Sequence, residues 1–333
     1  MTARATDAPA GQDEIRWLLI KAKGGLGNRM LSAVTGLVYA DLTGRTPVID
    51  WSDGVYAPQG RNAYPLLFDA PDMPPVAALP QDAGIVPEFW KSRLDMVPDR
   101  IIETFEAGDH SNPRIYRKYS VALETLDHAE QVAVFWSYLP KMARLRRHLR
   151  ADPRFRGRST AEIFADYIAR HFKPNTRVRD EVGAFVSGLP RPVIGVHVRY
   201  TDRKFPLDKV VSEIERQKRA MPGAAIFLAT DSGIVEDRMR QEFSEVHTTP
   251  KYLPTDDERL HSTQQTVFDK VHEAENAMID MWTLAQCDML IYSKNSTFSL
   301  CSALIGDLRK DQQVDIDRHN LPIVVKRLVQ PFI

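Results

Sequence analysis

Residues 23–29 read KGGLGNR and begin two residues after the apolar run WLLI at 17–20. Such a run predicts a buried strand, and we expect a helix over residues 28–42. The three glycines between them let the chain turn sharply and let backbone amides approach a ligand closely, in front of a helix N-terminus with partial positive charge. The turn is therefore suited to an anion or a crowded sugar.

The glycine turn also has two alternative interpretations. A dinucleotide-binding fold makes the same demand, and Gly25-x-Gly27 with Asp50 after the second strand would serve an NAD(P)-dependent oxidoreductase. However, Met30 holds the place of the third glycine of that fingerprint, where it would push the helix off the strand. Alternatively, Gly24, Gly25 and Gly27 only make a tight turn between strand and helix.

The composition excludes several classes of protein. The chain has 333 residues, of which 43% are hydrophobic, and this fits one large or two medium domains. Because 44 basic residues balance 44 acidic ones, no global field favours nucleic acid or an anionic membrane. No window approaches the ~20 apolar residues of a transmembrane segment. Residues 1–14 lack the features of a signal peptide and are expected to be a flexible tail. Cys287 and Cys301 are expected to be buried thiols in a cytoplasmic setting.

Apolar runs alternate with amphipathic stretches, which is typical of βαβ units and parallel sheets. In the first half we expect strands over residues 17–20, 46–49 and 131–136, helices over 28–42 and 160–172, and long loops over 51–85. In the second half we expect strands over 193–198, 225–228 and 289–292, and helices over 207–220, 234–243 and 266–286. The economical interpretation is an α/β protein with two Rossmann-like domains facing a central cleft, residues 15–175 and 176–333, with a linker that starts at 173–175.

A second group of polar residues follows the strand over 193–198. Side chains alternate along a strand, so His197 and Arg199 face the same side at its carboxyl end, where open α/β sheets bind ligands. The planar fork of arginine donates two parallel hydrogen bonds to a phosphate and stays charged. An Arg199–Asp202 ion pair that caps the strand would explain the same residues without a ligand.

Polar residues also follow the next two strands of this half. Asp231 is a candidate residue for binding a ligand, although a helix N-cap would also explain Asp231 or Ser232. In the run NSTFS, however, Asn295, Ser296 and Thr297 place more hydroxyls and amides at one helix N-terminus than capping requires. This turn is therefore a second candidate for an anion site.

Asp280 lies near the middle of the helix expected over 266–286, next to the apolar face of that helix. A buried carboxylate needs a hydrogen-bond donor. A guanine edge would supply donors, and so would a neighbouring Arg or Lys.

Two further features leave alternatives open. Asp-x-Asp at 315–317 has the form of a metal-binding motif, but its position after the strand series predicts a solvated turn. Trp51, Tyr56, Tyr64 and Trp90 either stack on sugar rings or pack as a satellite core.

Four motifs occur in the order of a known superfamily. GGLGN, HVRYTD, LATD and NSTFS resemble the GDP-fucose-dependent fucosyltransferases. The run YADLTGRTPVIDW at 39–51 is most similar to the bacterial nodulation fucosyltransferase (NodZ) branch, which is related to the α1,6-fucosyltransferases. The resemblance covers residues 17–70 and 190–306. It implies a GT-B fold, an N-terminal acceptor domain, a C-terminal donor domain, and an inverting, metal-independent transfer of L-fucose from GDP-fucose to a glycan hydroxyl.

The resemblance also implies roles for single residues. Arg199 corresponds to the arginine that holds the donor β-phosphate, and His197 with Asp280 to the pair that reads guanosine. Ser296 and Thr297 fall where hydroxyls and amides touch the diphosphate.

Asn28 corresponds to the asparagine of the family's glycine loop, beside the reacting centre. This sequence departs from the family at two places. Tyr200 stands where many relatives have the second of two adjacent arginines, which removes one charge from the leaving-group clamp. The carboxylate proposed as the base in the α1,6 branch falls at or near Leu207, so Asp202 and Asp208 are the candidates for the base. A catalytically idle nucleotide-sugar binder therefore stays open as an alternative.

Overall fold

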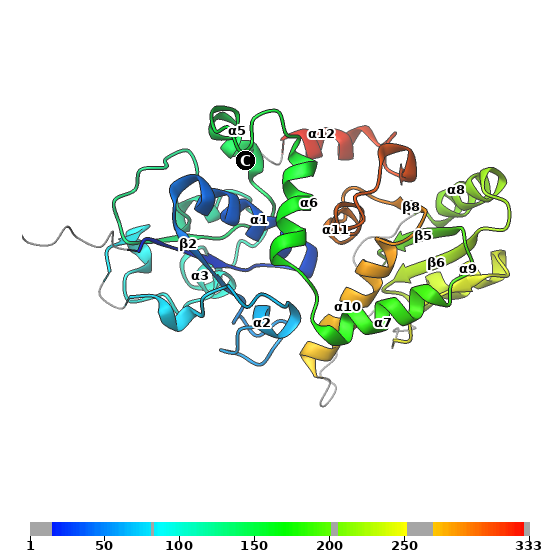
Figure 1. Cartoon of the computed structure of the whole chain (residues 1–333), viewed down its shortest axis with the longest axis horizontal. Coiled ribbons are helices and arrows are strands. Elements are labelled where there is room, and N and C mark those ends of the chain that lie inside the picture. Colours follow the sequence, from blue (N-terminus) through cyan, green and yellow to red (C-terminus); the bar gives the residue numbers. More distant parts are fainter. Residues whose placement is uncertain (1–14, 81–82, 201–205, 252–268, 330–333) are drawn as a thin grey trace, which may run out of the picture.

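The computed structural model describes residues 15–80, 83–200, 206–251 and 269–329. These residues form two α/β lobes, each built on one sheet (Figure 1). The sheet of the first lobe has the strand order β2-β1-β4-β3, and that of the second lobe has the order β7-β6-β5-β8-β9. All neighbouring strands in both sheets pair in parallel. The expected α/β class with two Rossmann-like sheets is confirmed.

The first lobe is built around its central strand. Its strands are β1 (Trp17–Lys21), β2 (Thr46–Asp50), β3 (Ile85–Val86) and β4 (Val132–Phe135). Its helices are α1 (Leu26–Thr43), α2 (Tyr64–Leu67), α3 (Pro98–Phe105), α4 (Tyr116–Tyr119), α5 (Met142–Ala151) and α6 (Thr160–His171), with short 3-10 turns at Val76–Ala78 and Glu88–Trp90. The residues LLI of β1 are fully buried because both faces of the sheet are covered, which explains the continuous apolar run.

Helix α1 lies close against β1. A Cβ atom on Gly36 would lie 2.9 Å from side-chain atoms of Ile20 and of Phe135. The close contact between helix and sheet is therefore made at Gly36, about one and a half turns after Met30, and Met30 itself is fully buried.

The second lobe repeats this plan with a wider sheet. Its strands are β5 (Val193–Val198), β6 (Ala225–Thr230), β7 (Val246–His247), β8 (Met289–Tyr292) and β9 (Gln313–Asp315). Its helices are α7 (Thr176–Ser187), α8 (Leu207–Ala220), α9 (Gly233–Glu242), α10 (Lys270–Leu284), α11 (Thr297–Ile305) and α12 (Leu321–Val329), with a 3-10 turn at Lys310–Gln312. Each long strand and helix expected from the sequence is present, with ends shifted by a few residues.

Three expectations about connections need correction or fall outside the described residues. Residues 51–85, expected to be long loops, include α2, a 3-10 turn and the start of β3. The linker expected to start at 173–175 is at once followed by α7, because Asn175 caps that helix by accepting a hydrogen bond from the Val178 amide at 3.0 Å. The expected tail over 1–14 and the expected helix start at 266–268 lie outside the described residues.

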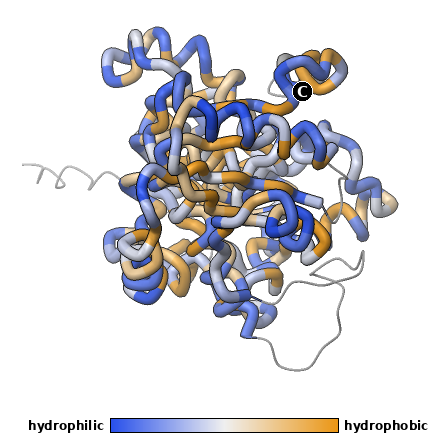
Figure 2. Tube along the Cα trace, turned by 90° about the vertical axis from the view of Figure 1, so that its right-hand side faces the viewer, coloured by the Kyte–Doolittle hydropathy of each residue, from blue (hydrophilic) through white to orange (hydrophobic). Residues whose placement is uncertain are grey.

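The two lobes share a hydrophobic core. Helices α6, α10 and α11 lie between the two sheets (Figure 1), and one buried cluster joins residues of α1 to Met278, Met281 and Cys301 of the second lobe. Figure 2 shows the hydrophobic segments in the middle of the molecule and hydrophilic segments on its outer helices. Cys287 and Cys301 are free and buried, as expected, and burial raises the pKa of the Cys287 thiol to about 12. In the described part of the chain, no helix has the length and apolar character needed to cross a bilayer.

Candidate active site at the junction of the lobes

The glycine loop before α1 reaches the other lobe. Only Gly24 needs the left-handed region, with φ of 78°, whereas Gly25 has φ of −71° and Gly27 lies inside the helix. A Cβ atom on Gly27 would lie 2.5 Å from the carbonyl carbon of Thr297 and 2.7 Å from the Phe298 nitrogen. A tight turn alone therefore explains Gly24, and Gly27 is needed because the backbones of the two lobes touch there.

Asn28 and Thr297 connect the starts of α1 and α11. The Thr297 hydroxyl donates a hydrogen bond of 2.5 Å to Oδ1 of Asn28. Neither helix has an acidic residue in its first turn. Two helix N-termini from different lobes thus meet with their partial positive charges uncompensated by carboxylates of their own. Such a junction is suited to an anion.

Arg29 is buried and binds the glycine loop. Arg29 donates from Nε to the Gly24 carbonyl at 2.6 Å, and its two terminal nitrogens donate to the carboxylate of Asp53 at 3.0 and 2.6 Å. Its guanidinium also lies 4.9 Å from the ring centre of Tyr56. Arg29 and Asp53 were not predicted from the sequence, although a charged residue in the first turn of an otherwise buried helix was a visible signal. This bidentate pair fixes the loop conformation.

The charge of Arg199 acts on Tyr56 at the junction of the lobes. Burial raises the pKa of Tyr56, and the positive charges of Arg29 and, more weakly, of Arg199 oppose that rise. Arg199 follows β5 of the second lobe, whereas Tyr56 belongs to the first lobe. The guanidinium of Arg199 therefore acts across the boundary between the lobes.

His197 is buried near the end of β5. Its Nδ1 lies 2.7 Å from the Ser299 hydroxyl, and its ring stacks on Phe298 with centres 4.9 Å apart. Burial lowers the pKa of His197 to about 3, and the charges of Lys251 and Arg199 add to this effect. The ring is therefore neutral at ordinary pH. Its Nε2 has no hydrogen-bond partner among the described residues, which leaves that nitrogen for a ligand.

Asp280 pairs with a lysine, which was one of the two kinds of partner expected for it. Its carboxylate accepts a hydrogen bond of 2.5 Å from the Thr249 hydroxyl and forms an ion pair with Lys251. The side chain is buried. Because the same Lys251 charge acts on His197, the two residues expected to read guanosine lie in one cluster. Thr249 and Lys251 were missed because nothing in the local sequence links them to Asp280.

Capping does not explain the polar residues after β6 and β8. Ser232 and Ser296 occupy the N-cap positions of α9 and α11, but neither side chain makes a capping hydrogen bond. Asp231 instead accepts from the Tyr200 amide at 2.7 Å, and the Asn295 amide donates to the Ser293 hydroxyl at 3.1 Å. The Ser296 hydroxyl is buried without a hydrogen-bond partner in the described part of the chain. A buried hydroxyl of this kind is unusual and suits a ligand.

Of the two candidates for the base, only Asp208 belongs to the described residues, and it lies away from the junction. Asp202 lies outside the described residues. The Asp208 side chain is 93% exposed in the first turn of α8 and lies 3.5 Å from Arg238. Its ion-pair partner thus belongs to α9, on the far side of the second lobe from the glycine loop. A different carboxylate stands near that loop, because Lys23 pairs with Asp99 and lies 3.0 Å from His110.

Asp50, the acid that the oxidoreductase alternative requires, is already bound by residues of the first lobe. Asp50 forms a buried ion pair of 2.6 Å with Lys21 and accepts hydrogen bonds from the amide and hydroxyl of Ser52. Its carboxylate is therefore used inside the first lobe, at the place where a ribose would have to bind. The NAD(P) interpretation is not supported.

The Asp-x-Asp motif begins in the second sheet and continues into the turn after it, and its carboxylates are engaged by protein groups, which corrects the expectation of a solvated turn. Asp315 ends β9, and both carboxylates pair with Arg327, at 2.6 and 3.4 Å. They also bind the turn after β8, since Asp315 accepts from the Lys294 amide at 3.2 Å and Asp317 accepts from Ser293. The motif supports the NSTFS turn. Among the described residues, no group of three or more His, Cys, Asp or Glu is placed to hold a metal ion.

The loop aromatics divide between the two alternatives. Trp51, Tyr64 and Trp90 are almost completely buried and belong to hydrophobic clusters of the first lobe. Tyr56 alone of the four is only partly covered and lies beside the glycine loop, 3.9 Å from the position of a Cβ atom on Gly25. The satellite-core interpretation therefore holds for three of them.

Comparisons with known proteins agree with this architecture. A sequence model of the Nodulation protein Z (NodZ) family matches residues 161–321. The nodulation protein Z of Azorhizobium caulinodans is 25% identical over 321 residues, which cover 88% of this chain and 90% of that protein. A solved NodZ α1,6-fucosyltransferase, soaked with GDP-fucose, shares the fold with a TM-score of 0.63 and 23% identity over 87% of this chain and 92% of that one. POFUT1 in complex with GDP has a TM-score of 0.52 and 12% identity over 92% of this chain and 99% of that one.

Two lobes with parallel sheets, whose helix N-termini meet at a polar junction, define a protein of the GT-B class of glycosyltransferase folds. Within that class, the chain is similar to the nodulation protein Z family and to a solved NodZ α1,6-fucosyltransferase. The resemblance seen in the four sequence motifs is confirmed.

Proposed function

We propose that this chain is an inverting glycosyltransferase that moves L-fucose from GDP-fucose to a hydroxyl of a glycan acceptor. The observation that carries the proposal is the meeting of two helix N-termini at Gly27 and Thr297, beside Arg199. This arrangement concentrates positive potential without nearby first-turn acids, and a nucleoside diphosphate is the anion that fits it. The solved relative that was soaked with GDP-fucose supports the choice of donor.

The donor end of the mechanism follows from three groups of the second lobe. As the bond between fucose and GDP breaks, negative charge develops on the diphosphate. Arg199, the Ser296 hydroxyl and the backbone amides at the start of α11 are placed to stabilise that charge. Loss of one such preorganised donor typically costs ~3 kcal/mol, or about a hundredfold in rate. We propose that these groups act without a metal, because Asp315 and Asp317 are engaged by Arg327.

Guanine recognition is assigned to the cluster around Asp280. The neutral His197 ring has Nε2 available, and each carboxylate oxygen of Asp280 has a second acceptor site beyond its contact with Thr249 or Lys251. Guanine presents N–H groups to such acceptors, whereas uracil and thymine have no equivalent amino group. Selectivity for GDP over UDP and dTDP is the consequence.

On the acceptor side, we propose that residues 15–175 bind the glycan and residues 176–333 bind the donor, with the glycan hydroxyl attacking from the face opposite to GDP. We propose that Asn28 of the glycine loop stands next to the reacting centre and that Asp202 is the remaining candidate for the base, because Asp208 is exposed and pairs with Arg238 of α9. A base in this role contributes ~10²–10⁴ in rate. We also propose a cytoplasmic location, because both thiols are free.

Thermal shifts and transfer assays test this function together. GDP and GDP-fucose should raise the melting temperature, while UDP, dTDP and NADH should not, because only a ligand of the folded state stabilises it. Radiolabelled fucose should then appear on at least one member of an oligosaccharide panel that includes chitooligosaccharides.

Each alternative gives its own result. Binding of GDP-fucose without transfer to any acceptor would show a catalytically idle binder. Loss of transfer in excess EDTA, restored by a divalent cation, would contradict the metal-free mechanism. A shift with NADH but not with GDP would overturn the proposal as a whole.

A further inference from the structure

Basic residues are concentrated in one segment of this otherwise balanced chain. Residues 141–158 contain eight Lys or Arg and a single acid, Asp152, although the whole chain has 44 basic and 44 acidic residues. Six of these arginines are exposed: Arg146, Arg147, Arg150, Arg154, Arg156 and Arg158. The proposed function makes no use of them.

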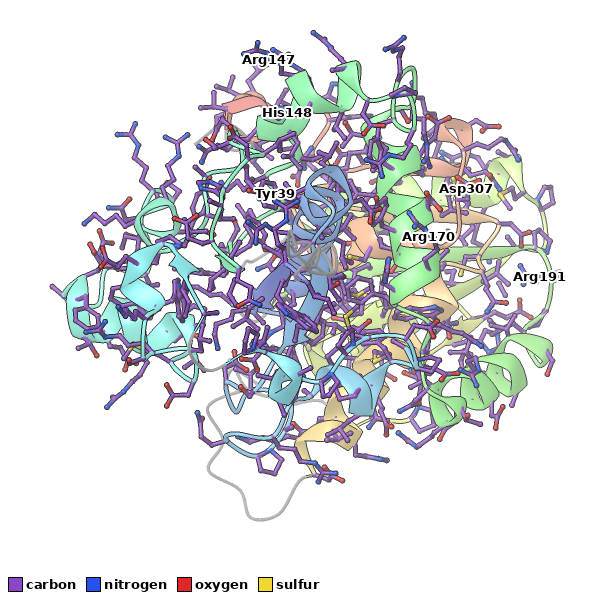
Figure 3. All side chains as sticks on the ribbon, turned by 60° about the vertical axis from the view of Figure 1, so that its left-hand side comes forward. Tyr39, Arg147, His148, Arg170, Arg191 and Asp307 are labelled. Carbon is purple, nitrogen blue, oxygen red and sulfur yellow. The ribbon has the colours of Figure 1, made fainter. Side chains whose placement is uncertain are left out.

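The fold presents part of this charge on one face of α5. Met142, Leu145 and Leu149 are buried and hold the helix against the first lobe. Arg147 and Arg150 lie on the other face, and Figure 3 shows Arg147 at the upper end of the molecule. Neither of these two arginines has an acidic partner in the described part of the chain. Four arginines of α5 and two alanines line a shallow hollow on this surface.

Helix α12 exposes an apolar stripe. Leu321, Val325 and Val329 are 73%, 56% and 49% exposed, and their spacing of four residues places them on one side of the helix. They are three of the eight large hydrophobic residues that are exposed in the described ranges. On the opposite side of α12, Arg327 pairs with Asp315 of β9 at 2.6 Å. The stripe therefore faces away from the sheet that holds the helix.

The basic helix and the apolar stripe lie at the same end of the molecule. Figure 1 shows α5 and α12 at its upper end, although they belong to different lobes. Figure 3 is turned about the vertical axis of that view, which preserves height, and it shows Arg147 at the same end. A flat surface laid on this end would meet both helices, whereas a small ligand would not span them.

We propose that α5 and α12 form a docking face for a bilayer surface rich in anionic phospholipid. Arginine forks bind phosphate oxygens, and an apolar helix stripe enters the boundary between headgroups and acyl chains. Each signal alone is weak, and two together give stable but reversible attachment.

Charge selects the bilayer over the other occupants. In a symmetric dimer through this end, the arginines of α5 would face a second copy of themselves, and like charges would repel. Nucleic acid would match the arginines but would leave Leu321, Val325 and Val329 without an apolar partner. This inference does not depend on the proposed transfer reaction.

Vesicle flotation with the full chain tests the proposal. The protein should float with vesicles of phosphatidylcholine and phosphatidylglycerol at about 0.1 M salt, and should bind pure phosphatidylcholine at least about tenfold more weakly. The variant R147E/R150E should lower binding to anionic vesicles at least about tenfold. The matched control K91E/R100E makes the same charge change around α3, away from this end, and should stay within about twofold of wild type. A third variant, L321S/V325S/V329S, should also weaken binding, because the stripe no longer enters the bilayer.

Four results would overturn the proposal. These are no binding to anionic vesicles, equal binding to both vesicle types, equal effects of the two charge-reversal variants, and a dimer that L321S/V325S/V329S dissociates while vesicles are not bound. Binding of an RNA oligonucleotide without vesicle binding would count against it as well. Unchanged far-UV circular dichroism and melting temperature confirm that each variant is folded, since all the substituted side chains are exposed.

Discussion

The hydroxyl of Thr297 donates a 2.5 Å hydrogen bond to Oδ1 of Asn28, joining the first turns of α11 and α1. This contact fixes the orientation of the Asn28 amide, whose nitrogen lies beside Gly24. The amide NH2 group is thus turned toward the glycine loop as a hydrogen-bond donor. The two lobes are aligned at the place where we propose that the donor and the acceptor meet.

Removal of either partner should have different effects on catalysis. Thr297→Val removes only the hydroxyl, so we expect turnover to fall by less than about tenfold, in line with ~1 kcal/mol for one neutral hydrogen bond. Asn28→Ala also removes the amide donor next to the reacting centre, and kcat should fall by about a hundredfold. Steady-state kinetics of both variants check this order. Equal losses would mean that Asn28 only aligns the lobes.

Gly27→Ala should destabilise the protein, and Gly25→Ala should not. A methyl group on Gly27 meets backbone atoms of Thr297 at 2.5 Å, and such overpacking costs ~1–3 kcal/mol, which exceeds the ~1 kcal/mol that Ala gains over Gly in a helix. At Gly25 the nearest atom is 3.9 Å away and φ is −71°, so the change should stay below ~1 kcal/mol. Urea unfolding measures both free energies. A Gly27→Ala variant as stable as Gly25→Ala would contradict the contact between the lobes.

Arg199→Lys should reduce kcat by about a hundredfold with little change in melting temperature. Lysine keeps the charge but loses the planar fork that binds two phosphate oxygens at once. The exposed Arg216→Lys, in a helix of the same lobe, is the matched control and should retain full activity. Activity of Arg199→Lys close to wild type would remove Arg199 from the mechanism.

His197 should make stability depend on pH. In the folded state its pKa is about 3, and in the unfolded state it is close to 6.5. Between these values the unfolded state binds more protons, so this contribution to the free energy of unfolding is complete above pH 6.5 and is lost as the pH falls. The variant His197→Gln lacks this pH-dependent contribution to the free energy of unfolding. The stability difference between wild type and this variant should therefore shrink by about 3 kcal/mol from about pH 7.5 to about pH 4.5.

Chemical denaturation at both pH values measures this difference. His171, whose pKa burial also lowers, is present in both proteins, so its contribution cancels. A difference that does not change with pH would show that the pKa of His197 is not lowered in the folded state. Transfer activity should show no inflection from this ring between about pH 5 and pH 8, because the folded protein keeps it neutral.

Sequence patterns predicted the parts of the fold that are local. The strands at 17–20 and 193–198 are continuous apolar runs because both faces of their sheets are covered. The helix after the glycine loop could be predicted from its own apolar positions. Strands β3 and β9 have only two and three residues, too few to show a period. Periodicity could not have found them.

The site was harder to predict because its decisive contacts are long-range. Gly27 was recognised as a turn residue, but its real neighbour is Thr297, and no local pattern links the two. In the same way, Asp280 was seen to need a donor, but the sequence did not choose between guanine and Lys251. The sequence shows the chemistry of each residue, but the residues that it contacts far along the chain are seen only in the folded structure.

The hydrophobic cluster that joins α1 to Met278, Met281 and Cys301 has a consequence for how the molecule can be divided. A chain cut after residue 175 would expose these side chains to water on both fragments. Neither fragment is then expected to fold alone, and the two fragments should become folded only when they are mixed. The protein is accordingly a single cooperative unit, in which one half cannot be exchanged for that of a distant relative without refitting the shared interior.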